Sequence, residues 1–286
     1  MKFIKNNYVL LIVCFIFLLS GTISALNYKK EIINARKTWV MHYKTSCSNG
    51  NVSDCDVKVV NMDTIATYGY IVNIYDCHMY YIAPLLIITI ASYYLHKYIR
   101  KGYLKQAINR KEYNALIKDI YIKVLKCSLI LPLYMLFLFI VSYILSGHFD
   151  YNVGKDVYRY IGFNNIELSI HWVKFIILYI INFFINSIFW INIAMLNIKH
   201  NKSLVVSIIV SYIELILMYM IFESVALLLP NIESIMLCFL LKPIWDPHDI
   251  SYLGLISVSS MFAILTMFMI RFKYKNKEDL LEEISK

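Results

Sequence analysis

Long apolar stretches alternate with polar segments along the whole chain, and this alternation is the strongest pattern in the sequence. A helix of about 20 predominantly apolar residues is long enough to cross the hydrocarbon core of a bilayer. The pattern therefore predicts an all-α membrane protein with six transmembrane helices in one transmembrane domain, residues 1–286. The predicted spans are residues 8–26, 79–95, 127–145, 172–196, 204–229 and 253–270.

The polar segments between the spans differ in length and in pattern. Residues 27–78 form the longest polar segment and are predicted to be an outer loop. After Pro230, the apolar core at 235–241 is too short to cross a bilayer, which predicts a broken interfacial or re-entrant hairpin before span six. The tail 271–286 begins basic and ends acidic.

Span one has two interpretations. Lys2 and Lys5 precede an apolar core that ends in the small residues at 20–25, and this pattern also fits a cleavable signal peptide. Because five more spans follow, we favour a signal anchor that is retained.

Composition supports the membrane class. The chain is 59% hydrophobic and only 16% charged, whereas a soluble chain has about 25% charged residues. The net charge of +9 lies mainly at the ends of the spans. There it acts as a topology signal and as a contact for anionic lipids, so nucleic acid is not a predicted partner.

The distribution of basic residues predicts the orientation. Residues 97–126 contain nine Lys and Arg against two acids, and Lys/Arg-rich loops remain in the cytoplasm. If this segment is cytoplasmic, 18 Lys and Arg lie inside and 10 lie outside. Six of the 10 outside fall in the long loop 27–78, where charge constrains the orientation little. We therefore expect a multi-pass protein of the cell membrane with both termini in the cytoplasm.

Segment 97–126 also has a helical pattern. A short amphipathic helix is predicted first, then a bend at 109–111, then a second helix that leads into span three. A basic loop that is solvated and lies against the lipid is the alternative. The apolar residues that recur at helical spacing are Leu104, Ala107 and Ile108, followed by Tyr113, Ile117, Ile120 and Val124.

Catalytic and metal-binding motifs are missing from the sequence. It contains no G-x-x-x-x-G-K-[ST] loop, no H-E-x-x-H and no G-x-S-x-G. The seven His are scattered, and none pairs at the spacing of metal ligands. We expect no enzyme activity, no metal site and no cofactor in this chain.

Glu214 is predicted to lie about 15 Å into span five, near the middle of the membrane. An acid at that depth is costly and marks a functional site by default. The alternative is a protonated Glu214 that is hydrogen-bonded to a neighbouring helix, with Asn182 and Asn186 on span four as candidate partners. Glu223 is expected near the outer surface.

Three cysteines, Cys47, Cys55 and Cys77, fall in the predicted outer loop. Disulfides form on oxidising surfaces, and Cys47 with Cys55 closes the shortest loop. All three can instead remain reduced. Cys14, Cys127 and Cys238 are most simply small apolar residues of the membrane region.

Four short motifs follow one another along about a quarter of the chain: Pro84-Leu85-Leu86, Gly102-Tyr103-Leu104-Lys105, Arg110-Lys111-Glu112-Tyr113 and Leu131-Pro132-Leu133. With these motifs the chain resembles the permease subunits of type-2 ATP-binding-cassette (ABC) exporters of low-GC Gram-positive bacteria. In these permeases a Pro-Leu-Leu span leads into a basic segment and then into a Leu-Pro-Leu span. They usually begin with an amphipathic cytoplasmic helix, whereas here only about seven residues precede span one.

This resemblance implies a transport function. It implies that ATP and Mg²⁺ are bound by a separate P-loop ATPase subunit, and that a second permease subunit, identical or homologous, completes the pathway. The implied substrate is a peptide, an antibiotic or a lipid-like molecule, as in bacteriocin or lantibiotic export and self-immunity. The implied coupling helix contains Arg100, Lys101, Gly102, Tyr103, Leu104, Lys105, Ala107, Ile108, Arg110 and Lys111.

Two other function classes remain open. The chain can be a non-transporting immunity or sensory protein that binds through its outer loop. It can also be an ATP-independent carrier with Glu214 as the proton-coupling group, although the sequence shows no inverted repeat and no pair of Gly/Pro-broken spans.

Overall fold

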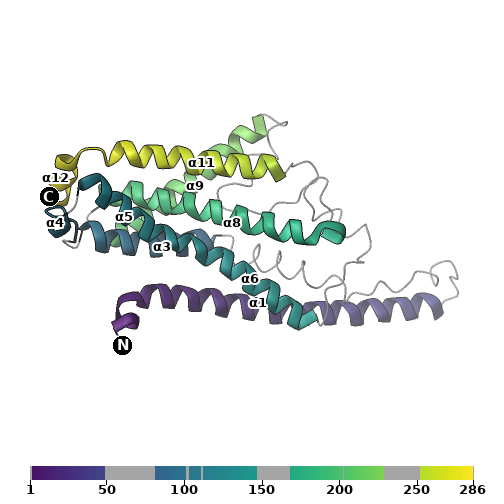
Figure 1. The fold of residues 1–286 in the computed structure, drawn as a ribbon. Helices are drawn as coiled ribbons and strands as arrows, with labels where there is room; N and C mark the ends of the chain where they lie inside the picture. Colours follow the sequence, from purple (N-terminus) through teal and green to yellow (C-terminus); the bar gives the residue numbers. More distant parts are fainter. Residues whose placement is uncertain are drawn as a thin grey trace.

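The computed structural model describes residues 2–48, 81–100, 103–110, 112–146, 168–201, 203–228 and 252–285, and in these ranges the chain is helical apart from short turns. The described helices lie roughly side by side along one long direction (Figure 1). In chain order they are α1 (Lys2–Ser48), α3 (Ile82–Leu95), η4 (His96–Arg100), α4 (Tyr103–Ala107), α5 (Tyr113–Leu125), η5 (Lys126–Leu129), α6 (Ile130–Ser146), α8 (Leu168–Ile198), α9 (Leu204–Leu228), α11 (Tyr252–Lys273) and α12 (Lys277–Ser285).

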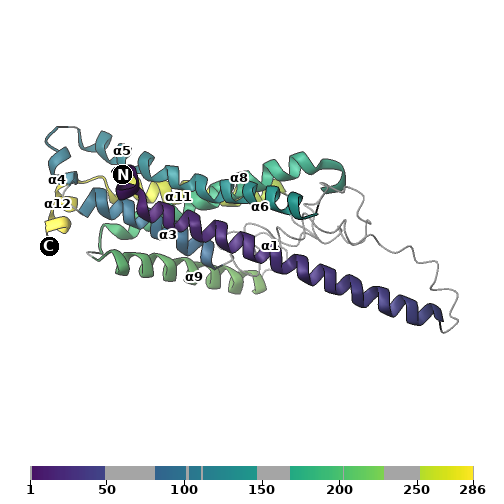
Figure 2. The ribbon, with the colours of Figure 1, turned by 90° about the horizontal axis from the view of Figure 1, so that it is seen from below.

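Within the described ranges, six helices are long and apolar enough to cross a membrane, which confirms the prediction of an all-helical, multi-pass membrane protein. The chain ends lie toward the same end of the bundle (Figures 1 and 2). The six segments are Tyr8–Asn27, Ile82–Arg100, Tyr113–Val141, Ile180–Ile198, Leu204–Ile221 and Ile256–Lys273.

Span three begins earlier than the predicted start at Cys127. Helices α5, η5 and α6 follow one another without a break and form one apolar stretch, Tyr113–Val141. The reason lies in α5, where Leu116, Ile120 and Val124 recur every four residues and are buried. This helical face packs into the core, so α5 belongs to the bundle and not to a surface loop.

Helix α1 continues far beyond span one. The segment predicted as an outer loop, 27–78, begins as helix and remains helical to Ser48. At 1.5 Å per residue, the 47 residues of α1 measure about 70 Å, more than twice the thickness of a hydrocarbon core. Figure 2 shows α1 extending well past the other labelled helices.

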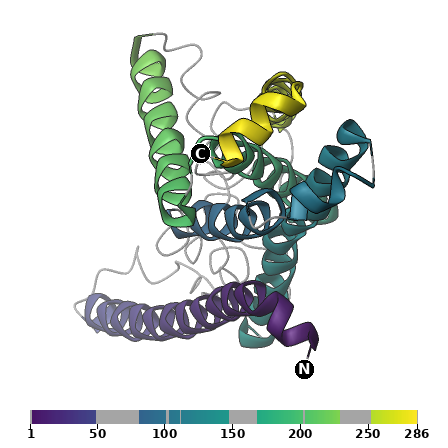
Figure 3. The ribbon, with the colours of Figure 1, turned by 90° about the vertical axis from the view of Figure 1, so that its left-hand side faces the viewer.

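Helix α8 is the centre of the bundle. It packs against α3, α6, α9 and α11, and an end-on view shows it surrounded by these helices (Figure 3). Its aromatic residues Phe183, Phe189 and Trp190 are almost completely buried. Helices α9 and α11 expose most of their apolar side chains, as expected for spans that face lipid.

Helix α1 packs closely against α6 at Gly21. A Cβ atom on Gly21 would lie 2.8 Å from Leu138 Cδ2 and 2.9 Å from the Tyr134 hydroxyl oxygen. One turn away, the rings of Phe17 and Tyr134 are 4.9 Å apart. Small residues permit such close approach of membrane helices. Span one is therefore packed closely against α6.

Candidate functional site at the α4–α12 end

Helices α4 and α12 lie together at one end of the bundle, where span two leads into span three (Figure 1). The chain turns at 108–110, close to the predicted bend at 109–111. The coupling residues that the family resemblance implies belong to this region. Lys101, Gly102 and Lys111 lie outside the described residues, and the side chain of Lys105 does too.

The apolar face of this segment is turned toward the chain's own core. Leu104 is completely buried, and Ala107 and Ile108 are partly buried against the same core. These three side chains were expected to be available to a docking partner. The side chains that the segment exposes include those of Gln106, Asn109 and Arg110.

Arg100 connects three helices at this end. Its guanidinium group donates hydrogen bonds to the carbonyl oxygens of Ile198 at 3.4 Å, of Glu283 at 2.8 Å and of Lys199. Ile198 ends α8, and Glu283 lies in the last turn of α12. Carbonyl groups at helix C-termini have no partner within the helix and lie at the negative end of the helix dipole. Arg100 satisfies them and fixes η4 against α8 and α12.

Lys199, in the turn that follows α8, has a similar role. The side chain is buried, and its ammonium group donates to the carbonyl oxygen of Lys273, the last residue of α11, at 3.0 Å. The hydroxyl of Tyr274 donates to the carbonyl oxygen of Met195 at 2.8 Å, and burial raises the pKa of Tyr274. Lys199 thus joins the end of α8 to the end of α11.

Helix α12 is docked onto this surface. Leu280 is completely buried, and Glu283 Oε1 lies 2.9 Å from His200 Nδ1. From the sequence, residues 271–286 were expected only as a cytoplasmic tail. Its helix signals are Asn276 immediately before the first turn and the acids Glu278 and Asp279 within that turn.

A row of tyrosines leads from the start of span one to α4, and it was not predicted. The consecutive ring centroids are 5.4 to 6.4 Å apart. The Lys123 ammonium group lies 5.4 Å from the ring centroids of both Tyr98 and Tyr103, within the range of cation–π attraction. The row consists of Tyr8, Tyr93, Tyr94, Tyr98 and Tyr103.

A buried polar layer joins α8 to α11. The Asn186 amide donates to Asn182 Oδ1 at 3.2 Å and to the Ser259 hydroxyl at 3.4 Å. The Ser259 hydroxyl donates to Asn182 Oδ1 at 3.1 Å. Asn182 and Asn186 therefore act as polar contacts between helices, and their partner lies on α11.

A second part of this layer includes α5. The Asn192 amide donates to the Thr266 hydroxyl at 2.9 Å and to the Ala263 carbonyl at 3.1 Å. The Tyr121 hydroxyl donates to Asn192 Oδ1 at 2.8 Å. The side chain of Asn192 is thus bonded on both sides, which favours one relative arrangement of α5, α8 and α11.

Glu214 has a different partner from the one expected. Its Oε2 accepts a hydrogen bond from the Asn197 amide at 2.5 Å, and its side chain is exposed. Asn197 lies about 16 to 22 Å further along α8 than Asn186 and Asn182. Helix α9 crosses the bundle at a tilt (Figure 3), so the position of Glu214 along its own helix does not give its depth.

The structure describes only some of the remaining residues and segments that were predicted to matter, namely two of the cysteines. Cys14 and the buried Cys127 are free thiols in the membrane region, and no three His, Cys, Asp or Glu gather as metal ligands in the part of the chain that the structure describes. Three predictions concern residues that the structure does not describe: the disulfide candidates (Cys55, Cys77 and the side chain of Cys47), the side chain of Glu223, and the hairpin at 229–251.

No family model, curated protein or solved structure matches this chain.

Proposed function

We propose that this chain is the membrane-spanning permease subunit of an ABC exporter in a bacterial cell membrane, with both termini in the cytoplasm. A separate P-loop ATPase subunit supplies the energy of ATP hydrolysis. A second permease subunit, identical or homologous, completes the pathway. The exported molecule is a peptide, an antibiotic or a lipid-like compound, and its export protects the producing cell or delivers the molecule.

The observation that supports this proposal most directly is the firm anchoring of the α3–α4 corner. Leu104 is buried in the core, and Arg100 bonds to carbonyl groups at the ends of α8 and α12. A partner that pushes on this corner would move these helices together, because packed cores and interfaces shift between discrete arrangements and do not deform continuously. Such a corner suits the transmission of ATP-driven closure to the spans.

The burial of apolar side chains at this corner leaves fewer residues for contact with an ATPase subunit. Because Leu104, Ala107 and Ile108 pack inward, the contact in this proposal is made by the exposed tip, Gln106, Asn109 and Arg110. A polar tip on an anchored corner can leave its partner without exposing apolar surface.

The test is affinity purification of the full chain in mild detergent, followed by mass spectrometry. We expect a stoichiometric P-loop ATPase that is released by Arg110→Glu and retained by Arg271→Glu. Arg271 is an exposed arginine at the end of α11, so it serves as a control with the same change of charge. Recovery of the chain without an ATPase would overturn the exporter proposal. An ATPase that Arg110→Glu does not release would overturn only the contact site.

The continuation of α1 to Ser48 favours a second candidate function. Beyond Asn27 this helix extends past the other labelled helices (Figure 2). The side chains of Lys30, Ile33 and Lys37 in this part are exposed. A rod of this kind suits a non-transporting immunity or sensory protein that binds outside the membrane. Co-purification of a surface or signalling protein that is lost on deletion of residues 31–48, with no ATPase present, would favour this function.

A further inference from the structure

The C-terminal helix α12 is attached to the rest of the chain through few side chains. It turns across the end of the bundle beside α4 (Figure 1), and within the described residues it makes no broad contact with another helix. Leu280 is the one side chain that the described part of α12 buries completely. A helix of nine residues is marginal by itself, so the stability of α12 depends on these few contacts.

Glu283 joins α12 to two other parts of the chain. Its carbonyl oxygen accepts a hydrogen bond from Arg100 at 2.8 Å, and its carboxylate oxygen Oε1 lies 2.9 Å from His200 Nδ1. The Arg100 guanidinium group also bonds to the carbonyl oxygens of Ile198 and Lys199, which do not belong to α12. Release of α12 would therefore leave the α3–α4 corner attached to the end of α8 but remove one of the three bonds of Arg100.

Two buried polar atoms at this end have no hydrogen-bond partner in the described part of the chain. They are Glu283 Oε2 and the hydroxyl oxygen of Tyr113, the first residue of α5. Tyr113 lies within the range of electrostatic interaction with Asp279, in the first turn of α12. A buried polar atom without a partner costs free energy that contact with water would recover. These two atoms therefore weaken the docked arrangement of α12, whereas Leu280 and Arg100 favour it.

We propose that α12 is a detachable latch on the α3–α4 corner. In the docked state Leu280 is buried and the Glu283 carbonyl binds Arg100, so that α8 and α12 hold the corner together. In the released state the two unpaired polar atoms gain water, and α8 alone receives Arg100. Opposing contributions act on one small helix, so the two states lie close in free energy. The latch acts on the chain's own corner and does not depend on the transport function.

The experiment is hydrogen–deuterium exchange of the full chain in detergent, measured by mass spectrometry over residues 96–110 and 273–285. Leu280→Gln removes the buried anchor of α12. We expect backbone exchange to become about tenfold faster in α12 and about threefold faster in the α3–α4 corner, because the latch is released more often.

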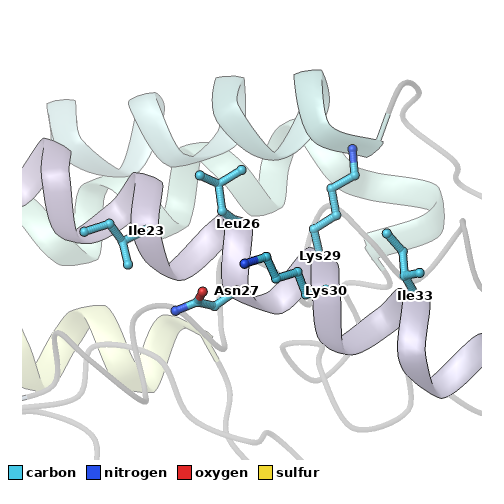
Figure 4. A pocket seen from close by; sticks show the side chains of 6 residues that line it. All are labelled: Ile23, Leu26, Asn27, Lys29, Lys30 and Ile33. Carbon is cyan, nitrogen blue, oxygen red and sulfur yellow. The ribbon is translucent and has the colours of Figure 1, made fainter.

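Two control variants introduce the same residue at exposed positions. Glu278→Gln lies on α12 itself. Ile33→Gln lies on α1, where the Ile33 side chain lines a cavity and is 43% exposed (Figure 4). Ile33 is about 46 Å along α1 from Lys2, and both chain ends lie toward the α12 end of the bundle, so Ile33 is remote from the latch. Both variants should leave exchange in α12 and in the corner unchanged.

Tyr113→Phe tests the latch in the opposite direction. It removes one unpaired hydroxyl and keeps the ring, so docking should become tighter and exchange in α12 should slow about threefold. If the Tyr113 hydroxyl were instead a stabilising contact, its removal would make exchange faster.

Three results would overturn the proposal. Faster exchange in α12 alone in Leu280→Gln would show that α12 is a loose tail that does not hold the corner. Equally faster exchange in all helices would show that α12 is an inseparable part of the bundle. Unchanged exchange in Leu280→Gln, or faster exchange in Tyr113→Phe, would show that the docked arrangement is not balanced by these groups.

Discussion

The guanidinium group of Arg100 donates a hydrogen bond to the carbonyl oxygen of Glu283 at 2.8 Å, although 183 residues separate the two in the sequence. This bond brings the end of span two to the C-terminal helix. Arg100 was expected to contact a partner subunit, but its guanidinium group bonds to carbonyl oxygens of its own chain.

Replacement of Arg100 by Ala should loosen the C-terminal helix. Hydrogen bonds to charged groups contribute about 1.5 to 3 kcal/mol each, and the change leaves carbonyl groups at two helix ends without this donor. We expect a lower unfolding temperature in detergent and faster proteolytic cleavage in the residues before α12. Arg271→Ala, on an exposed arginine, should change stability by less than about 0.5 kcal/mol. Equal protease sensitivity of the two variants would contradict the Arg100 contact.

Leu104 tests whether the apolar face of α4 is internal. Since Leu104 is completely buried, Leu104→Ala should lower the free energy of unfolding by about 2 to 5 kcal/mol. Gln106→Ala, on the exposed side of the same helix, should have little effect. Thermal unfolding of the purified chain without any partner measures both. A Leu104→Ala chain as stable as the unchanged one would show that this face is free for docking.

Gly21 tests the packing of span one. Gly21→Leu places atoms where Leu138 and Tyr134 already lie, so α1 must move away from α6 at a cost of about 1 to 3 kcal/mol. Leu19→Phe adds volume on the exposed side of α1 and should be tolerated. The readout is the unfolding temperature together with the intact mass of the chain. An N-terminus found after residue 25 would contradict a retained span one.

The pair Tyr121 and Asn192 tests the polar layer. Tyr121→Phe removes the donor to Asn192 Oδ1, and Asn192→Ala removes the acceptor. A double-mutant cycle should give a coupling energy of about 0.6 kcal/mol, the average for hydrogen bonds between membrane helices. Ser128→Ala is a control, because its hydroxyl bonds only within its own chain segment, to the Leu125 carbonyl. A coupling energy of zero would mean that α5 and α8 are not held by this bond.

Glu214 distinguishes an ABC exporter from a proton-coupled carrier. In Glu214→Gln the amide oxygen can still accept from Asn197, so the contact between α9 and α8 is kept while the titratable group is lost. We expect ATP-dependent export to continue at a similar rate. Loss of pH-dependent transport in this variant would favour the carrier mechanism. Transport into vesicles at two pH values provides the measurement.

Much of the fold could be predicted from sequence, because the signal for each span is local. The bends near residue 109 and the six apolar stretches follow from residues close to one another in the chain. The start of span three was predicted less accurately, at Cys127 and not at Tyr113. A helix that leads into span three, with Ile120 and Val124 at helical spacing, was predicted, but the pattern alone did not show that Leu116, Ile120 and Val124 are buried. Only the neighbouring helices decide that burial.

The candidate site was predicted less well, since a side chain's partner is a long-range property. An apolar face at 104–108 indicates burial, but the pattern is the same whether a partner subunit or the chain's own core covers it. In the same way, Asn182 and Asn186 were predicted as hydrogen-bond partners of Glu214. In the structure both asparagines bond to Ser259, and Glu214 accepts a hydrogen bond from the Asn197 amide.

The sequence by itself determined the membrane class and the six spans, because the transfer of about 20 apolar residues into lipid is favourable wherever the rest of the chain lies. Only the tertiary structure decided the roles of Arg100, Leu104 and Glu214. Their hydrogen bonds and burial depend on the tilt and contact of helices far apart in the sequence, and in a bilayer each polar group must find its partner within the protein.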